Sequence, residues 1–309
     1  MYESICIANM KREDWLKLRK AGIGGSDAGA ICGLNPYSTP MSVYRDKTSV
    51  HISDEDNEAM RQGRDLEDYV ARRFMELTGL KVRRSNMMYR SREHPFMIAD
   101  VDRLIVGEDA GLECKTASAY NADKWKNGEV PAHYLVQCHH YMAVTGKNKW
   151  YIAVVILGQG FQYAEIKRDQ AVINDLISIE EAFWNVNVKA GVMPDPDGSK
   201  ICDEIIARYY PSAKKGQAVP LIGFDKKLER RQEIDVLIKK LEIESNQIDQ
   251  EIKIYMEEAE SAVSDKFRVS WSSYESARLD SKRLKSEQPE IYQKFSATNQ
   301  SRRFMVRVA

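Results

Sequence analysis

Several features that would point away from a globular protein of the cell interior are scarce or absent in this sequence. Its 46 lysine and arginine residues are balanced by 46 aspartate and glutamate residues. This balance argues against nucleic-acid binding by bulk charge but leaves room for a local basic groove. No apolar run approaches the roughly 20 residues of a membrane-spanning helix. The first residues, Met1-Tyr2-Glu3-Ser4, are unlike a signal peptide. We therefore expect a cytoplasmic protein with no membrane partner.

Cysteine is sparse and scattered. The five cysteines include no CxxC pair, which argues against a zinc site, an iron–sulfur cluster or a disulfide framework and favours a reducing compartment. They are Cys6, Cys32, Cys114, Cys138 and Cys202. With 309 residues, of which 43% are hydrophobic, the chain can form one sizeable core plus an appendage, or two domains.

The most informative residues lie on what the sequence predicts to be two adjacent strands. The first strand spans residues 96–106 and contains Asp102, and the second spans residues 111–115 and contains Glu113 and Lys115. The segment between them is rich in Gly and Asp, as in a hairpin loop. Because side chains alternate between the two faces of a strand, Glu113 and Lys115 share a face, and Asp102 can face them across the ladder.

This combination of side chains favours metal-assisted hydrolysis of a phosphodiester. Two carboxylates and a backbone carbonyl, here that of Cys114, suit an oxygen-binding cation such as Mg²⁺. An ammonium beside them can orient a water molecule and lower its pKa. The same spacing also fits a solvated hairpin with a polar outer face. Leu112 and Cys114 alternate with the charged residues, which indicates that one face of the strand is buried.

The pattern of the first 198 residues predicts an α/β domain with a mixed sheet flanked by helices. A Gly-rich turn at residues 21–25 leads into a helix whose N-terminus suits a phosphate, although an ordinary turn and N-cap fits equally. A helix over 56–78 has an apolar stripe of Leu66, Val70, Phe74 and Leu77. Further helices are predicted over 11–20, 121–127, 133–144 and 169–190, and strands over 81–90, 150–157 and 162–166.

Residues 194–198, Pro-Asp-Pro-Asp-Gly, mark a boundary, and residues 199–309 form a mainly helical C-terminal extension with a few strands. A long amphipathic helix is predicted over 225–260, with an apolar period of about 3.5 residues that fits either an intrachain packing face or an oligomer seam. Strands are predicted over 266–271 and 303–308, and a helix over 286–295. Basic residues gather near the C-terminus, as a solvated surface or a DNA or protein contact: Arg278, Lys282, Arg283, Lys285, Lys294, Arg302, Arg303 and Arg307.

Taken together, these motifs resemble those of the PD-(D/E)XK nucleases. The Gly-Ile-Gly-Gly-Ser-Asp turn, Glu67 on the first core helix, Asp102, Glu113-x-Lys115 and the QxxxY element of Gln137 and Tyr141 occur in the family's order. They are most similar to the YqaJ-type viral recombinase branch, which resembles lambda exonuclease. The resemblance covers roughly residues 10–195 and implies a PD-(D/E)XK nuclease core.

The resemblance also implies a role for each matching residue. Asp102 and Glu113 would bind Mg²⁺, or Mn²⁺ as a substitute, together with the carbonyl of Cys114. Lys115 would orient the attacking water and stabilise developing charge. Glu67 would help to hold a metal ion or its waters.

Further matching residues would contact the DNA. Gln137 would position Lys115 or the DNA backbone, with support from Tyr141. Arg19 and Ser26 would hold the 5′-phosphate of a DNA end, because the arginine fork fits a phosphate.

The sequence departs from the family pattern in one place. The usual Asp-Gly after the first motif strand is Asp102-Arg103 here, so a different loop geometry is expected. Asp100 shares a predicted strand face with Asp102 and is an alternative ligand, although Asp102 is preferred for its distance to Glu113.

The implied function is that of a magnesium-dependent double-stranded DNA exonuclease. It would digest one strand from the 5′ end and leave a 3′ single strand for an annealing protein of a phage or prophage recombination system in a bacterial cytoplasm. The family further implies a homotrimer around DNA. Two alternatives stay open: a structure-specific or restriction-type endonuclease on the same scaffold, and a non-catalytic DNA-binding recombination scaffold.

Overall fold

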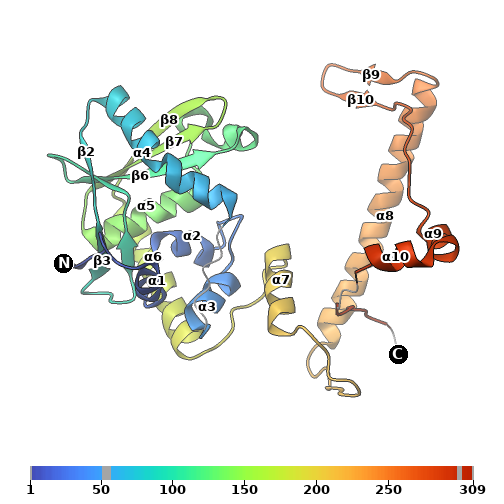
Figure 1. Ribbon diagram of the computed structural model, residues 1–309, viewed down its shortest axis with the longest axis horizontal. Coiled ribbons are helices and arrows are strands. Elements are labelled where there is room, and N and C mark those ends of the chain that lie inside the picture. The colour runs from blue at the N-terminus through green and yellow to red at the C-terminus, as the bar shows by residue number, and fades with distance from the viewer. Residues whose placement is uncertain (1, 51–56, 298–300, 308–309) are drawn as a thin grey trace. The chain divides into compact units, whose positions relative to one another are not determined.

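The computed structural model describes residues 2–50, 57–297 and 301–307 (Figure 1). The chain divides into two compact units, Met1–Tyr209 and Tyr210–Ala309. The first unit therefore extends beyond the boundary predicted at residue 198. The reason is helix α7 (Lys200–Tyr209), whose Cys202 and Ile205 are buried beside Met41 of α3 (Pro40–Thr48).

The central sheet of the first unit is mixed, as the sequence predicts. Its strand order is β2-β5-β6-β7-β8; β6 and β7 are parallel, and the other neighbours are antiparallel. Strand β7 is apolar at every position after Lys149, and it is buried on both faces. The strands are β2 (Val82–Arg84), β5 (Arg103–Ile105), β6 (Ala110–Ala117), β7 (Lys149–Ile156) and β8 (Gly160–Lys167).

Helices cover both faces of this sheet (Figure 1). On β7, Ile152 and Val154 belong to the apolar cluster that includes α5 (Ala132–Thr145), whereas Ala153 between them packs with Phe74 of α4 (Glu58–Thr78). This alternation follows from the two-residue period of a strand. Leu77, predicted to share the stripe on α4, is 55% exposed instead, because the buried residues of α4 end at Phe74.

A second sheet has the order β1-β3-β4, made of β1 (Tyr2–Cys6), β3 (Met87–Ser91) and β4 (Ile98–Asp100). The single strand predicted over 96–106 is wrong, because the chain leaves this sheet after Asp100 and enters the central sheet as β5 at Arg103. Asp102 therefore lies in the break between two strands of different sheets. The hairpin predicted between this segment and the next strand is confirmed as the antiparallel pair β5–β6.

The Gly-rich turn packs tightly against α5. Helix α1 (Arg12–Lys20) precedes it and α2 (Gly25–Ile31) follows it. A Cβ on Gly25 would lie 2.6 Å from a ring carbon of Tyr141, so only glycine permits this approach. Ile23 forms a parallel bridge with Met97, which fixes the turn beside β4. The N-cap of α2 is Gly24, whose N–H donates to Asp27 Oδ2 at 2.9 Å.

The remaining elements of the first unit complete its helical layers. A 3₁₀ segment spans Ala119–Gly128, where a helix over 121–127 is predicted. Helix α6 (Gln170–Ala182) continues as a π-helical segment over Phe183–Lys189. Across the described residues of both units, no helix is long and apolar enough to cross a membrane.

The second unit consists of a long helix, a hairpin and two short helices. Helix α8 (Asp225–Met256) ends before the predicted residue 260, because the chain turns into the hairpin of β9 (Ser261–Val263) and β10 (Arg268–Ser270). The helix predicted over 286–295 is two helices, α9 (Ser281–Glu287) and α10 (Pro289–Phe295). The strand predicted over 303–308 is absent from residues 303–307, and residue 308 lies outside the described residues.

Candidate active site

Glu113, Lys115 and Gln137 form the centre of a buried polar cluster. On β6, Glu113 Oε1 lies 2.6 Å from the ammonium of Lys115. The same oxygen accepts a hydrogen bond of 2.7 Å from Gln137 Nε2 on α5. The Gln137 amide is also 2.7 Å from the hydroxyl of Tyr141, one helical turn further on. Glu113 and Lys115 share a face of β6, as predicted, and this face meets the side of α5 that carries Gln137 and Tyr141.

Asp102 joins this cluster from the break between β4 and β5. Its Oδ2 accepts a 2.8 Å hydrogen bond from the backbone N–H of Cys114. An extended residue directs its N–H and C=O to the same side of a strand, so the Cys114 carbonyl also faces Asp102. Asp100 lies nearby, and its Oδ2 accepts a 2.8 Å hydrogen bond from the indole of Trp15.

Most of these groups line one cavity of about 200 Å³, although Lys115 is not among its described lining residues. Asp100, Asp102 and Glu113 form its acidic wall, and Arg19 and Ser26 lie at the Gly-rich turn. The structure therefore brings the two predicted carboxylates, Gln137, Tyr141 and the two predicted phosphate ligands to a single cavity. Arg19 Nη2 lies 3.3 Å from Ser26 Oγ, and its guanidinium lies over the Trp15 ring at 5.0 Å.

Glu67 contributes to the cluster less directly than its predicted role requires. Its carboxylate forms an ion pair with Arg103, whose buried guanidinium also pairs with Asp68 at 2.6 Å. Arg103 stands where the family pattern has glycine, so this pairing is the local consequence of that departure. Among the described residues, no three His, Cys, Asp or Glu side chains form a group that could hold a metal ion.

The electrostatics of the cluster oppose two ionised carboxylates. Burial, followed by the charges of Glu113 and Glu67, raises the pKa of Asp102 well above its usual value. Burial also raises the pKa of Glu113, although the ammonium of Lys115 counters this shift. Glu113 Oε2 is buried and accepts no hydrogen bond from the described residues. The unpartnered oxygen and the raised pKa values indicate that Lys115 alone does not offset two ionised carboxylates.

Lys115 is the cation of the cluster and stays protonated. Burial is the largest single influence and disfavours its ammonium, but the charges of Glu113, Tyr134 and Asp102 and the hydrogen bond to Glu113 together raise the pKa of Lys115. The ammonium also lies 4.8 Å from the centre of the Tyr134 ring. Lys115 can therefore donate hydrogen bonds and stabilise negative charge, but it cannot act as a general base near neutral pH.

Sequence reasoning missed two aromatic members of the site. Tyr134 precedes Gln137 by three residues, so helical spacing places it on the same face of α5. Trp15 precedes Arg19 by four residues on α1, with the same consequence. Helical periodicity could have identified both, although it gives no information about Lys115 or Asp100 as their partners.

The adjacent histidines His139 and His140 contact different partners, because neighbouring positions on a helix point in different directions. His139 Nδ1 lies 2.9 Å from the carbonyl oxygen of Leu135, and His140 Nδ1 lies 2.8 Å from Glu180.

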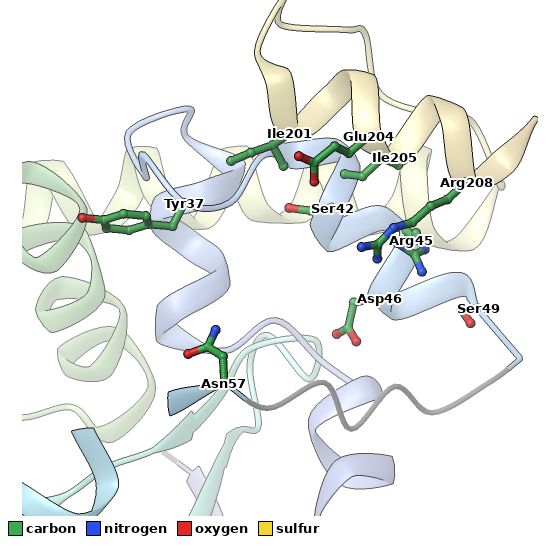
Figure 2. A pocket seen from close by; sticks show the side chains of 10 residues that line it. All are labelled: Tyr37, Ser42, Arg45, Asp46, Ser49, Asn57, Ile201, Glu204, Ile205 and Arg208. Atoms are coloured by element: carbon green, nitrogen blue, oxygen red, sulfur yellow. The ribbon is translucent and has the colours of Figure 1, made fainter. Parts of the chain in front are cut away.

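A larger cavity of about 500 Å³ lies elsewhere in the first unit, between α3 and α7 (Figure 2). Arg45 and Arg208 line it together with Asp46 and Glu204. The described residues that line it include none of the predicted site residues. Because both signs of charge share its walls, it is not a basic phosphate-binding surface.

Comparison with known proteins identifies relatives of the chain and of its fold. Residues 14–148 match the family described as YqaJ-like viral recombinase domain. The crystal structure of an alkaline exonuclease (LHK-Exo) from Laribacter hongkongensis superposes with a TM-score of 0.50 at 18% identity, covering 64% of this chain and 100% of that one. A structure of LHK-Exo in complex with dAMP also gives 0.50, at 19% identity and with 64% and 97% covered. At these identities the likeness shows a shared fold, the helix-flanked mixed sheet of this nuclease.

The sequence match to a bacterial protein is far closer and extends through both units. "Uncharacterized protein YqaJ" of Bacillus subtilis (strain 168) is 39% identical over 306 residues, which are 97% of this chain and 95% of that protein. With this identity over nearly its whole length, the chain belongs to the YqaJ family.

Proposed function

We propose that this protein is a metal-dependent exonuclease that digests one strand of double-stranded DNA from the 5′ end in a phage-type recombination system. The observation that carries the proposal is a cavity lined by Asp102, Glu113 and Arg19, with Lys115 ion-paired to Glu113 beside it. Membership of a viral recombinase family supports it, as does the shared fold with a protein named as an alkaline exonuclease.

The residues present fit a divalent cation. Glu113 Oε2 is a buried oxygen without a hydrogen-bond partner, and Asp102 lies close enough for the charge of Glu113 to raise its pKa. Asp102, Glu113 and the Cys114 carbonyl offer only oxygen ligands, which suits Mg²⁺ or Mn²⁺. When bound, such an ion supplies an activated water and charge stabilisation at the phosphate. Asp102 is favoured over Asp100, whose carboxylate is held by Trp15.

The chain's own residues hold this arrangement in place. Gln137 donates a hydrogen bond to Glu113 Oε1. Glu113 Oε2 keeps no hydrogen-bond partner among the described residues and is available to a cation. Lys115, which stays protonated, donates to the attacking water or to the developing negative charge. Glu67 is engaged with Arg103 and acts through its charge, which raises the pKa values of Asp102 and Glu113.

Arg19 and Ser26 supply the preference for a DNA end. The guanidinium and the hydroxyl lie 3.3 Å apart at the cavity that contains the carboxylates. An arginine fork with a neighbouring hydroxyl binds a terminal phosphate, and an internal phosphodiester presents no such group. This end preference favours an exonuclease over an endonuclease.

We further propose that the 3′ single strand passes to an annealing protein, and that three chains assemble around the DNA. Both proposals rest on the resemblance to lambda exonuclease and on membership of the YqaJ family. We also propose that the protein acts in the cytoplasm of the bacterial host.

The proposal is tested by a time course on linear duplex DNA labelled at one 3′ end, with Mg²⁺, Mn²⁺ or EDTA. We expect the labelled strand to shorten progressively with either metal and to stay intact with EDTA. Closed circular DNA should stay uncut, since it has no end. Cutting of the circle would indicate an endonuclease, and bound but uncut DNA under every metal would indicate a scaffold.

Two variants connect the activity to the site. Lys115→Ala should lower the rate by about 10²- to 10³-fold, the usual effect of losing one transition-state donor. Lys147→Ala is its matched control, because Lys147 is also ion-paired, to Asp109, and the two lysines are similarly exposed, at 18% and 20%. Arg19→Ala should slow digestion of 5′-phosphorylated ends more than that of 5′-hydroxyl ends. Equal effects on both ends would disprove the end pocket.

A further inference from the structure

Helix α8 carries a continuous apolar stripe on its surface. The stripe positions from residue 234 to residue 255 are spaced alternately by four and three residues, which is the heptad spacing of a coiled-coil seam. Apolar side chains occupy all of them except Ser245: Ile234, Ile238, Leu241, Ile248, Ile252 and Tyr255. At 1.5 Å per residue the stripe is about 33 Å long, comparable to three heptads.

Within the second unit most of this stripe is exposed, although Ile252 is half-buried. Ile234, Ile238 and Ile248 are 40–51% exposed, and Leu241 is 64% exposed. On the opposite face, Val236 and Ile243 are followed at the same spacing by the polar Gln250, so no comparable seam forms there. A long, exposed and regular apolar seam on one face marks a protein–protein contact.

Charges are sorted around the stripe by sign. Between residues 234 and 255, every acid lies at a position directly flanking the stripe, on one side or the other: Asp235, Glu242, Glu244, Asp249 and Glu251. The lysines of the same segment lie away from the stripe: Lys239, Lys240 and Lys253. Apart from Asp235, which pairs with Arg231 on the same helix, these flanking acids show no ion pair with a described residue.

The acidic flanks decide which partner fits. In a parallel pair of α8 helices, Glu244 of one copy would face Asp249 of the other, and an antiparallel pair would also set acid against acid. Self-association is therefore opposed by charge. A nucleic-acid backbone is repelled for the same reason. A helix with basic residues on both sides of an apolar seam would instead gain ion pairs along the whole stripe.

We propose that the α8 stripe is a docking surface for an amphipathic helix of another protein, with lysine or arginine flanking its apolar seam. Residues 234–255 supply the seam and the acidic flanks, and Ser245 provides a polar position that helps to set the register. The surface does not use the nuclease cluster. Its partner contact can therefore be lost while DNA cleavage is retained.

The test uses the full-length chain and two fluorescent peptides of four heptads, each with Leu and Ile at the seam. One peptide carries Lys at both flanks, and the other carries Glu. We expect the Lys peptide to bind about tenfold or more tightly than the Glu peptide in fluorescence anisotropy, and binding to weaken with added salt. The double variant Glu244→Lys, Glu251→Lys replaces two flanking acids by bases. It should reduce or reverse the difference in affinity between the Lys peptide and the Glu peptide.

A matched pair of variants locates the surface. Leu241→Glu places a charge on the stripe and should weaken binding of the Lys peptide about tenfold or more. Ile243→Glu introduces the same charge on the opposite face at almost equal exposure, 67% against 64%, and should leave the affinity within about twofold. Circular dichroism confirms that both variants keep their helical content.

Three results would overturn the proposal. The first is equal affinity for the two peptides, or no binding of either. The second is equal weakening by Leu241→Glu and Ile243→Glu. The third is sedimentation showing that the chain self-associates and that Leu241→Glu abolishes this, which would assign the stripe to a second copy. DNA cleavage by Leu241→Glu should match the unmodified protein, so this test is independent of the nuclease assay.

Discussion

His140 on α5 and Glu180 on α6 form a fully buried pair, and its shared proton should control how stability depends on pH. His140 Nδ1 lies 2.8 Å from Glu180 Oε1, and Nε2 lies 2.8 Å from the carbonyl oxygen of Ile98. Because a carbonyl only accepts, Nε2 donates to Ile98, and a further proton is shared between Nδ1 and the carboxylate. The pair fixes α5, which carries Gln137, against β4.

The sign of the pH effect follows from this proton. Burial is the largest single influence and disfavours the imidazolium. The charge and hydrogen bond of Glu180, with the hydrogen bond to Ile98 and the charge of Asp27, together outweigh burial and raise the pKa of His140 above its ordinary 6.5. Burial raises the pKa of Glu180 as well, with Asp27 and His94 as further charged neighbours. Above pH 6.5 the unfolded chain has lost a proton that the folded pair keeps. The stabilisation is therefore complete below about pH 6.5 and is lost as the pH rises through the folded pKa, at up to about 1.4 kcal/mol per pH unit.

Replacing Glu180 with Gln should reverse this dependence. A neutral amide leaves burial as the main influence, so the pKa of His140 should fall below 6.5. Stability of the variant then rises with pH up to about 6.5 and becomes flat above it. Near pH 6 we expect the variant to be less stable by about 1–3 kcal/mol, because a charged hydrogen bond has been lost in the core.

The assay is urea denaturation at several pH values from 5.5 to 8.5, with tryptophan fluorescence as the signal of unfolding. A Trp271→Phe background makes the signal specific to the first unit, which contains every other tryptophan. Burial also lowers the pKa of His133 to about 4, but this affects both proteins equally, so the difference between their unfolding free energies is the quantity to read. That difference should decrease steadily with rising pH. The same slope in both proteins would refute the shared proton.

Three further predictions follow from the packing. Gly111→Ala should lower the free energy of unfolding by about 1–3 kcal/mol in urea denaturation, because the new Cβ would lie 2.2 Å from the Trp150 ring. In the control Gly160→Ala the new Cβ meets open space, so the free energy of unfolding should change by less than about 1 kcal/mol. Gln137→Leu should lower the cleavage rate about 10²-fold with little change in thermal midpoint, since it removes the donor to Glu113; an unchanged rate would contradict its role. A fragment of residues 1–212 should unfold cooperatively at nearly the full-length midpoint, because the first compact unit ends at Tyr209, and aggregation of this fragment would show that the units depend on each other.

Local periodicity was enough to predict most of the elements, whereas the family followed from the resemblance of short motifs. The stripe of Val70 and Phe74 predicts α4, and the continuous apolar run at 150–157 predicts the buried strand β7. The alternation of Glu113 and Lys115 with apolar residues predicts a strand with one polar face. Each of these inferences depends on neighbours two to four residues apart, whose geometry a regular strand or helix fixes.

Contacts between distant segments could not be predicted in this way. The break at Asp102 arises because β4 and β5 pair with different sheets, although the sequence across the break has no glycine or proline to mark it. The length of the first unit likewise depends on the packing of α7 against Met41, which is distant from α7 in the sequence. Leu77 has the spacing of a core residue, yet it is 55% exposed because it lies beyond Phe74, the last buried residue of α4.

The sequence by itself therefore determined which side chains are available for chemistry and on which face of a strand or helix each one lies. Only the tertiary structure decided their partners: Trp15 with Asp100, Arg103 with Glu67, and Tyr134 with Lys115. The physical reason is that a repeating backbone fixes the direction of a side chain within its own element. The distance to a side chain on another element depends on how the two elements pack, and small features such as the missing Cβ of Gly25 set that distance.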